Sequence, residues 1–294
     1  MKIKKSRDEI IFNVIVYPVI ALLTLACLIP FWLIVAASFT DNSAIMIDGY
    51  KLLPSRWSIN AYRYIFAAPM DILRSYGVTI FITVVGTFSG LFLITMAGYV
   101  LNRKDFKYRN KISFYIYFTT LFSGGMIPSY ILMVSVLNLQ NNYLSVILAG
   151  LMSPFLIILM RNFMKSIPDA LIEAAKIDGA GDFKIFTSIV IHLAGPAIAT
   201  VGLFLALGYW NNWYTPMLYL TKPKMYPLQY YLYNILTAQQ SAQQAGVIVE
   251  GMDTFPGEAI KMAMAVVATG PILLLYPYVQ KYFVRGITIG AVKG

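Results

Sequence analysis

Few side chains in this sequence could act on a covalent bond. His192 is the only histidine and Cys27 the only cysteine among 294 residues, so we expect neither a cluster of metal ligands nor a Ser-His-Asp triad. The pattern G-x-x-x-x-G-K followed by Ser or Thr, whose backbone amides cradle nucleotide phosphates, is absent from the sequence. The sequence therefore predicts that the chain is not an enzyme and holds no metal or cofactor of its own.

The most polar motif lies between long apolar stretches. It reads EAAKIDGAGDFKIF over Glu173–Phe186 and surrounds a Gly-Ala-Gly break with charged side chains of both signs. Gly179 and Gly181 permit a sharp reversal of the backbone, because glycine adopts conformations that are closed to other residues. The pattern predicts two short helices joined by a tight turn.

Local signals mark where these two helices begin. Ser166 and Asp169 have the spacing of a capping box, with Pro168 near the helix start. Asp182 is a candidate cap for the second helix. Several apolar side chains would lie on faces that need a partner: Leu171, Ala174, Ala175, Phe183 and Phe186. A single amphipathic helix would suit the inner lipid surface better, so the bent pair favours insertion into a cleft on a soluble protein.

The elements around this motif are hydrophobic. Hydrophobic residues make up 59% and charged residues 12% of the chain, and the mean hydropathy is +0.67, whereas soluble proteins carry about 25% charged residues. About 20 apolar residues span a bilayer as a helix. Six runs without Asp, Glu, Lys or Arg qualify: Ile11–Phe39, Gly77–Leu101, Ile112–Leu137, Leu144–Met160, Pro196–Leu220 and Met262–Val279. We therefore expect an all-α integral membrane protein with six transmembrane helices.

Basic residues are distributed unequally between the two ends of these helices. With the N-terminus inside, 16 of the 23 Lys and Arg residues fall on inner segments: Lys2, Lys4, Lys5, Arg7, Arg103, Lys104, Lys107, Arg109, Lys111, Arg161, Lys165, Lys176, Lys184, Lys281, Arg285 and Lys293. Because cytoplasmic loops are enriched in Lys and Arg, both termini and the polar motif are expected in the cytoplasm. The same distribution accounts for the net charge of +10 without a nucleic-acid partner. The first run is too long for the core of a signal peptide, which favours an uncleaved first helix.

The polar motif also matches a known pattern. The matching residues are Glu173, Ala174, Ala175, Asp178, Gly179, Ala180, Phe186, Ile189 and Pro196. In type and spacing they resemble the EAA motif of ABC importer permeases, the inner-membrane components of binding-protein-dependent transport. His192 departs from it, because the family has Leu-Pro at Ile191-His192-Leu193. This departure concerns the bend at the next helix, and we expect His192 to be a tolerated replacement.

Two further stretches, Leu121–Asn142 and Tyr282–Gly294, resemble the carbohydrate branch of these permeases, of the LplC/YtcP type. The likeness covers most of the chain and is closest from about Asp71 to the end. It implies a type I importer permease fold in a bacterial cell membrane, and a second, different permease subunit. It also implies two cytoplasmic ATPase subunits that bind ATP and Mg²⁺, and an extracytoplasmic solute-binding protein. The implied cargo is a carbohydrate, and within that class an oligosaccharide.

The chain divides into three predicted parts. Residues 1–70 hold the N-terminal tail, the first transmembrane helix and an outer loop. Residues 71–285 form the permease core, with five helices and a coupling loop at 166–195. Residues 286–294 form a cytoplasmic C-terminal tail.

Candidate site residues fall into three groups. The resemblance implies that six motif residues contact the ATPase: Glu173, Ala174, Ala175, Asp178, Gly179 and Ala180. Amides bond sugar hydroxyls and aromatic faces pack on sugar rings, so the substrate path is expected along Trp210, Asn211, Asn212, Trp213 and Tyr214. Trp and Tyr also anchor helices at membrane interfaces, and Asn also bonds between helices. A segment that reaches into the binding protein in some relatives resembles the stretch with Gln229, Tyr230 and Tyr231, which could equally pack on its own subunit.

Three alternatives remain at this point. The EAA pattern alone does not choose substrates, so an importer of amino acids or oligopeptides is the nearest one. A secondary transporter working alone should carry titratable residues inside the membrane, and the six runs have no carboxylate or basic side chain. A membrane glycosyltransferase should carry clustered carboxylates, whereas those of the outer loops are scattered.

Overall fold

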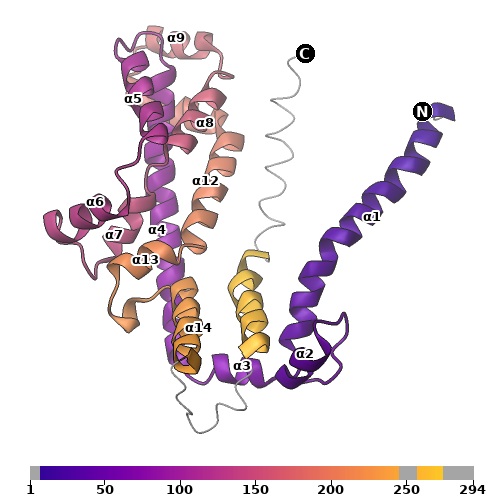
Figure 1. Ribbon diagram of the computed structural model, residues 1–294. Coiled ribbons are helices and arrows are strands. Elements are labelled where there is room, and N and C mark those ends of the chain that lie inside the picture. Colours follow the sequence, from indigo (N-terminus) through magenta and orange to yellow (C-terminus); the bar gives the residue numbers. More distant parts are fainter. Residues whose placement is uncertain (1–6, 245–256, 274–294) are drawn as a thin grey trace. The chain divides into compact units, whose positions relative to one another are not determined.

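The computed structural model describes residues 7–244 and 257–273 (Figure 1). Over these residues the regular structure is helical, apart from one isolated antiparallel bridge between Thr40 and Trp57. The predicted all-α class is thereby confirmed. The chain forms two compact units. Within the described residues, one holds 7–69, 238–244 and 257–271, and the other holds 70–237 with 272 and 273.

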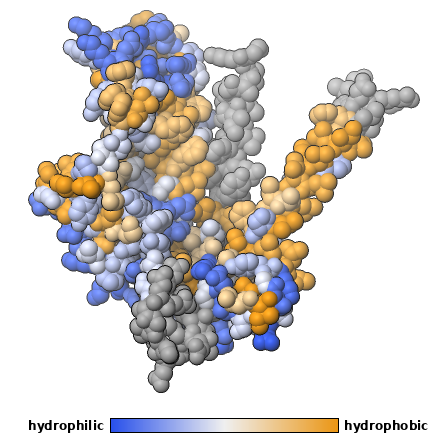
Figure 2. All heavy atoms as spheres, viewed as in Figure 1, coloured by the Kyte–Doolittle hydropathy of each residue, from blue (hydrophilic) through white to orange (hydrophobic). Residues whose placement is uncertain are grey.

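The first unit is built on α1 (Arg7–Ser38), which is hydrophobic along its length (Figure 2). The short helices α2 (Asn42–Asp48) and α3 (Asn60–Ile65) follow it. The side-chain oxygen of Asn42 accepts hydrogen bonds from the backbone N–H groups of Glu258 (2.9 Å) and Ala259 (3.4 Å). Asn42 thereby caps the start of the helix that covers residues 257–273, because the first N–H groups of a helix have no partner within it.

The second unit carries the polar motif. Its helices are α4 (Pro69–Asn102), α5 (Arg109–Leu121), α6 (Met126–Ile131), α7 (Tyr143–Gly150), α8 (Pro154–Met164), α9 (Asp169–Ile177), α10 (Asp182–Ile185), α11 (Ile191–Leu193), α12 (Gly195–Trp210) and α13 (Tyr214–Tyr219), with the π-helices η1 (Leu132–Val136) and η2 (Phe186–Val190) and the 3-10 turn η3 (Pro223–Met225). The last helix, α14 (Leu228–Gln244), begins in this unit, and its residues from 238 on belong to the first unit. Hydrophilic surface gathers at the end that carries α9, and hydrophobic surface lies below it over α8 and α12 (Figure 2).

The predicted spans correspond to two kinds of element. Two single helices, Phe12–Ser38 within α1 and α4, are long and apolar enough to cross a membrane. Three further candidates are bent pairs: α5 with α6 and η1 (114°), α7 with α8 (48°), and the helices of 182–193 with α12 (85°). The predicted fifth span does not continue to Leu220 as one helix, because α12 ends at Trp210. The predicted sixth span, Met262–Val279, lies only partly within the described residues, and the stretch Tyr282–Gly294 lies outside them.

Glycine or proline lies at each of these bends. Gly125 precedes α6 with φ +86°, a conformation that favours glycine. Pro154 opens α8, and Pro196 is the second residue of α12. Proline suits the first turn of a helix because it has no N–H group to satisfy there. Each bend therefore has a local cause in the sequence.

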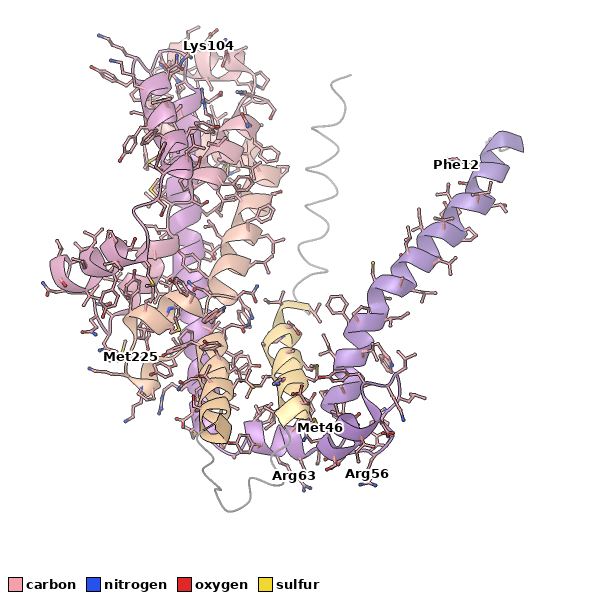
Figure 3. All side chains as sticks on the ribbon, viewed as in Figure 1. Phe12, Met46, Arg56, Arg63, Lys104 and Met225 are labelled. Atoms are coloured by element: carbon pink, nitrogen blue, oxygen red, sulfur yellow. The ribbon has the colours of Figure 1, made fainter. Side chains whose placement is uncertain are left out.

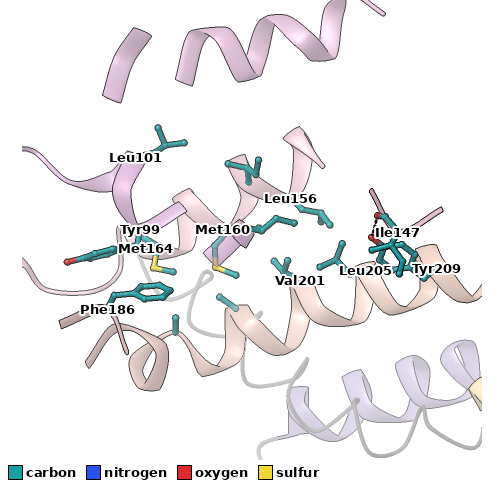
Figure 4. Packing of buried hydrophobic residues seen from close by; sticks show 14 of the residues in the cluster. Tyr99, Leu101, Ile147, Leu156, Met160, Met164, Phe186, Val201, Leu205 and Tyr209 are labelled. Carbon is teal, nitrogen blue, oxygen red and sulfur yellow. Dashed lines mark hydrogen bonds between the residues drawn. The ribbon is translucent and has the colours of Figure 1, made fainter. Parts of the chain in front are cut away.

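Buried hydrophobic side chains of α4, α7, α8 and α12 pack together in the second unit (Figure 4). A Cβ atom on Gly86 would lie 2.5 Å from the ring of Tyr209, and one on Gly90 would lie 2.8 Å from the backbone oxygen of Leu151. The hydroxyl of Tyr209 donates a hydrogen bond to the carbonyl of Ile147 at 2.7 Å. Small residues permit such close approach between membrane helices. The α4 glycines therefore seat α7 and α12 against one continuous support.

Candidate functional site

The polar motif forms the predicted pair of helices, but the predicted caps are wrong. Helix α9 begins at Asp169 after Pro168, without a side-chain cap. The hydroxyl of Ser166 donates to the carbonyl of Phe163 at 2.7 Å and so serves the preceding turn. Asp182 is the first residue of α10 rather than its cap, a position held by Gly181. The proline sets the entry into α9, and Ser166 is used elsewhere.

The end of α9 is a Schellman turn. The N–H of Ala180 bonds to the carbonyl of Ala175 at 2.9 Å, and the N–H of Gly179 bonds to that of Lys176 at 3.0 Å. This pair of bonds satisfies carbonyls that the helix leaves open, and it needs a left-handed residue between them. Gly179 supplies that residue with φ +79°. The reversal predicted at this glycine is confirmed.

The two faces of α9 differ. Ile172 and Ala175 are buried against the rest of the unit. Glu173, Ala174 and Asp178 are exposed, and the Ile177 side chain at the helix end is 86% exposed. The motif therefore presents one alanine inward and the other outward, beside an exposed apolar residue.

One of the two phenylalanines of the motif anchors its second half, and it lies in η2, directly after α10. Phe186 is 2% exposed and its ring lies 5.7 Å from that of Tyr99 and 5.9 Å from that of Phe92, both on α4. Phe183 is 66% exposed. Phe186 thus fixes the motif to α4, whereas Phe183 stays on the surface.

The departure at His192 does not remove the bend. His192 lies exposed on α11, and the chain turns by 85° between 182–193 and α12. Ala194 leaves the helical conformation, and Pro196 is the second residue of α12, which begins at Gly195. The bend is therefore carried by the residues after His192.

An ionic network joins the loop between α4 and α5 to α9. Two guanidinium nitrogens of Arg103 donate to the two carboxylate oxygens of Asp105, one of them at 2.8 Å. The same carboxylate accepts a hydrogen bond from the Lys176 ammonium at 2.9 Å. Arg103 and Lys176 each lie 3.7 Å from a carboxylate oxygen of Asp182. Lys104, labelled near α9 in Figure 3, pairs with Asp169 at 2.6 Å. Hydrogen bonds from Arg103 and Lys176 hold the pKa of Asp105 well below its ordinary value.

A cavity of about 170 Å³ lies between this loop and α9, and Arg103, Asp105, Glu173 and Lys176 are among its lining residues. The loop residues were missed as site residues in the sequence. The available signal was the opposite charge of the neighbours Lys104 and Asp105, which complements that of Asp169 and Lys176, seven residues apart. Over the part of the chain that the structure describes, no group of three metal-ligating side chains occurs.

Some of the predicted substrate-path residues have a structural role inside the subunit, and the others lie on its surface. Trp210 is 7% exposed, and Asn212 caps α13 by accepting a hydrogen bond from the N–H of Thr215 at 3.0 Å. Asn211, Trp213 and Tyr214 lie at the surface. The ring of Trp213 stacks on that of Tyr233, with centroids 4.4 Å apart.

The third group lies next to this surface. The amide of Gln229 lies 3.5 Å from the side-chain oxygen of Asn211. Tyr230 is 9% exposed and packs on Tyr226, with ring centroids 4.3 Å apart. Gln229 and Tyr231 are half-buried. Tyr230 therefore belongs to the core of the subunit, and its two neighbours lie nearer the surface.

Residues 90–289 match the family model of the binding-protein-dependent transport system inner membrane component. The chain belongs to this family of ABC transporter permeases, and the resemblance seen in the sequence is confirmed. A family of transport subunits agrees with the expectation that the chain is not an enzyme.

Individual relatives cover nearly the whole chain. The polygalacturonan/rhamnogalacturonan transport system permease protein YtcP of Bacillus subtilis is 41% identical over 97% of this chain and 99% of its own length. Protein LplC of the same organism is 39% identical over 91% of this chain and 90% of its own.

A solved structure supports the fold assignment. It is a crystal structure of a bacterial ABC transporter involved in the import of the acidic polysaccharide alginate. One of its chains superposes with a TM-score of 0.77 and 31% identity, covering 96% of this chain and all of that one. The chain thus has the fold of an ABC importer permease.

Proposed function

We propose that this chain is a permease subunit of an ATP-driven carbohydrate importer and that the α9–α10 elbow couples it to ATPase subunits. The observation that carries the proposal is the elbow itself, a Schellman turn at Gly179 with an exposed apolar residue beside it. Three similar proteins are named for the transport of polygalacturonan and rhamnogalacturonan, for the transport of arabinooligosaccharides, and for the import of alginate. These names support an oligosaccharide as the cargo.

The complex follows from this assignment. A second permease subunit completes the translocation path, two ATPase subunits bind ATP and Mg²⁺, and an extracytoplasmic binding protein delivers the solute. The chain crosses a bacterial cell membrane six times with both termini in the cytoplasm. Its permease core is residues 71–285, between the region 1–70 and the tail 286–294.

The elbow suits a mechanical contact. Leu171, Ile177 and Phe183 are 45%, 86% and 66% exposed, and exposed apolar side chains of this kind can pack into a groove on a soluble partner. Glu173 and Asp178 add carboxylates on the same segment, and Ala174, Gly179 and Ala180 leave room for a close approach of the partner. Ala175 acts from the inside by seating α9.

The surface around Asn211 suits a sugar. The amide group of Asn211 can exchange hydrogen bonds with hydroxyls, and the exposed faces of Trp213 and Tyr214 can pack on sugar rings. Trp210 and Asn212 hold this surface in place. Gln229 and Tyr231 contact the binding protein, with Tyr230 packed beneath them.

Replacing Gly179 tests the coupling. In the transporter assembled in proteoliposomes, Gly179→Val should keep the subunit in the membrane but uncouple ATP hydrolysis from uptake, because valine is strained at φ +79°. Gly181→Val is the matched control, since Gly181 has φ −70° and open space around a Cβ atom. Normal uptake per ATP in Gly179→Val would contradict the proposal.

The cargo is tested separately. Uptake and the accompanying ATP hydrolysis are measured with uronic-acid oligosaccharides, neutral oligosaccharides, oligopeptides and single amino acids. Stimulation of ATP hydrolysis by an oligosaccharide supports the assignment, and a response confined to peptides or amino acids overturns the carbohydrate part of it.

A further inference from the structure

The loop between α4 and α5 forms ion pairs with both ends of α9. Lys104 pairs with Asp169, the first residue of the helix, and Asp105 pairs with Lys176 in its last turn. Residues seven apart lie on the same face of a helix. Two adjacent loop residues therefore reach along one face of α9 and leave the opposite face uncovered.

We propose that Arg103, Asp105, Lys176 and Asp182 form a charge clamp that sets the orientation of the elbow, with Asp105 as its central positioning residue. This inference rests on the proposed coupling function and assigns part of it to a loop outside the EAA segment. The clamp turns the face with Ile172 and Ala175 inward, so the exposed face with Leu171 and Ala174 points to the ATPase.

The clamp is anchored in α4. The Arg103 side chain is 14% exposed, donates to the Tyr99 hydroxyl at 3.1 Å, and lies 5.7 Å from the centroid of the Tyr99 ring. Tyr99 in turn packs on Phe186 below the elbow. Movement of the elbow is thereby linked to the longest helix of the unit through Arg103 and through Phe186.

The clamp acts on position more than on stability. The side chains of Asp105, Lys176 and Asp182 are 56%, 40% and 71% exposed, and exposed ion pairs contribute little to folding because water screens them. The fork between Arg103 and Asp105 adds directional specificity, since a guanidinium and a carboxylate meet through two parallel hydrogen bonds. Loss of the clamp should therefore change coupling while the subunit remains folded.

Charge exchange tests the clamp in the assembled transporter. Asp105→Lys and Lys176→Asp each leave unbalanced like charges beside Arg103 or Asp182. The number of solute molecules imported per ATP should fall at least about fivefold in each, the lower end of typical coupling effects. The double variant restores two positive and two negative groups and should recover most of the ratio.

A second measurement follows the elbow directly. In the same complexes, the amides of residues 169–178 should exchange hydrogen about two- to fivefold faster in Asp105→Asn than in the unchanged protein, the range expected when exposed ion pairs are lost. Asp71→Asn is the matched control, because Asp71 also pairs with an arginine at 3.1 Å on an exposed surface. This control should change neither the ratio nor the exchange.

The outcomes separate the two proposals. If Gly179→Val uncouples while all clamp variants keep normal coupling and exchange, the clamp is wrong and the coupling function stands. If Gly179→Val and the clamp variants all couple normally, both proposals fall. Single variants that uncouple without recovery in the double variant, at unchanged amounts in the membrane, overturn the ionic basis of the clamp.

Discussion

Two pairs of connecting segments in the second unit are held by different chemistry. The loop after α4 is joined to α9 by ion pairs among Arg103, Asp105 and Lys176. The turn 138–143 is joined to the segment after α13 by the neutral side chain of Asn141. Its oxygen accepts from the N–H of Thr221 at 2.7 Å, the N–H of Lys222 at 3.2 Å and the Thr221 hydroxyl at 3.0 Å.

The two connections lie far apart along α4. Tyr143 packs against Phe81, with ring centroids 5.8 Å apart, while the ionic network begins one residue after Asn102. At 1.5 Å per residue, Phe81 and Asn102 are separated by about 30 Å. This distance matches the hydrocarbon thickness of a bilayer.

The ionic connection at α9 and the amide connection at Asn141 should differ in how much movement they allow. The amide connection depends on the direction and length of several hydrogen bonds that use one atom, and it fixes the turn in one geometry. Ion pairs on an exposed surface have broader minima and exchange partners easily, and Asp182 already lies 3.7 Å from both basic groups. The Asn141 end is therefore expected to be rigid, and the α9 end is expected to shift as a unit.

The largest effect is expected when the hydrogen bonds of Asn141 are removed. Asn141→Ala removes the hydrogen bonds to Thr221 and Lys222 and places alanine at φ +56°, so we expect a loss of about 2 kcal/mol in unfolding free energy. Thermal unfolding of the detergent-solubilised complex measures it as a lower Tm. Asn141→Gly keeps the backbone relaxed and should lose about half as much. Equal stability of Asn141→Ala and the unchanged protein would remove the distinction between the ends.

Some features of the elbow and of the long helices can be predicted from the sequence, and others cannot. The reversal at Gly179 is predictable because a left-handed turn is a local demand that glycine meets. The predicted cap at Ser166 failed because its hydroxyl donates to the carbonyl of Phe163 instead. The one at Asp182 failed because Gly181 holds the cap position, and the Asp182 carboxylate lies near Arg103 and Lys176. The long apolar helices α1 and α4 also follow from composition and length alone.

The ion pairs of the clamp and the bends within the predicted spans could not be predicted from local sequence patterns. Lys176 and Asp105 are 71 residues apart in the chain, and their pairing depends on how α4 and α9 pack. The break after Trp210 was hidden because Asn211 and Asn212 lie in an otherwise apolar run. Asn212 acts at this break because its side-chain oxygen accepts a hydrogen bond from the N–H of Thr215, in the first turn of the next helix, α13.

A smaller effect is expected when salt is raised. Between about 0.1 M and about 1 M, the Debye length falls from about 10 Å to about 3 Å, so exchange of the amides in α9 should become about twofold faster as exposed ion pairs weaken. The amides of the turn 138–143 should not respond, because its contacts are neutral. A response of equal size at both ends would show that charge does not distinguish them.

The smallest expected effect is that of pH near neutrality. The pKa of Asp105 lies below its ordinary value of 3.8 because Arg103 and Lys176 bond to the ionised form. A lowered pKa means that the carboxylate stabilises the clamp fully above pH 3.8 and that this contribution is lost as the pH falls through the lowered value. Exchange in α9, corrected for intrinsic rates, should therefore stay constant from about pH 5.5 to 8, the range in which an unperturbed histidine titrates. His192→Gln is the control, because His192 is the only histidine of the chain. A change within this range that survives His192→Gln would mean that a group other than the Asp105 clamp controls the elbow.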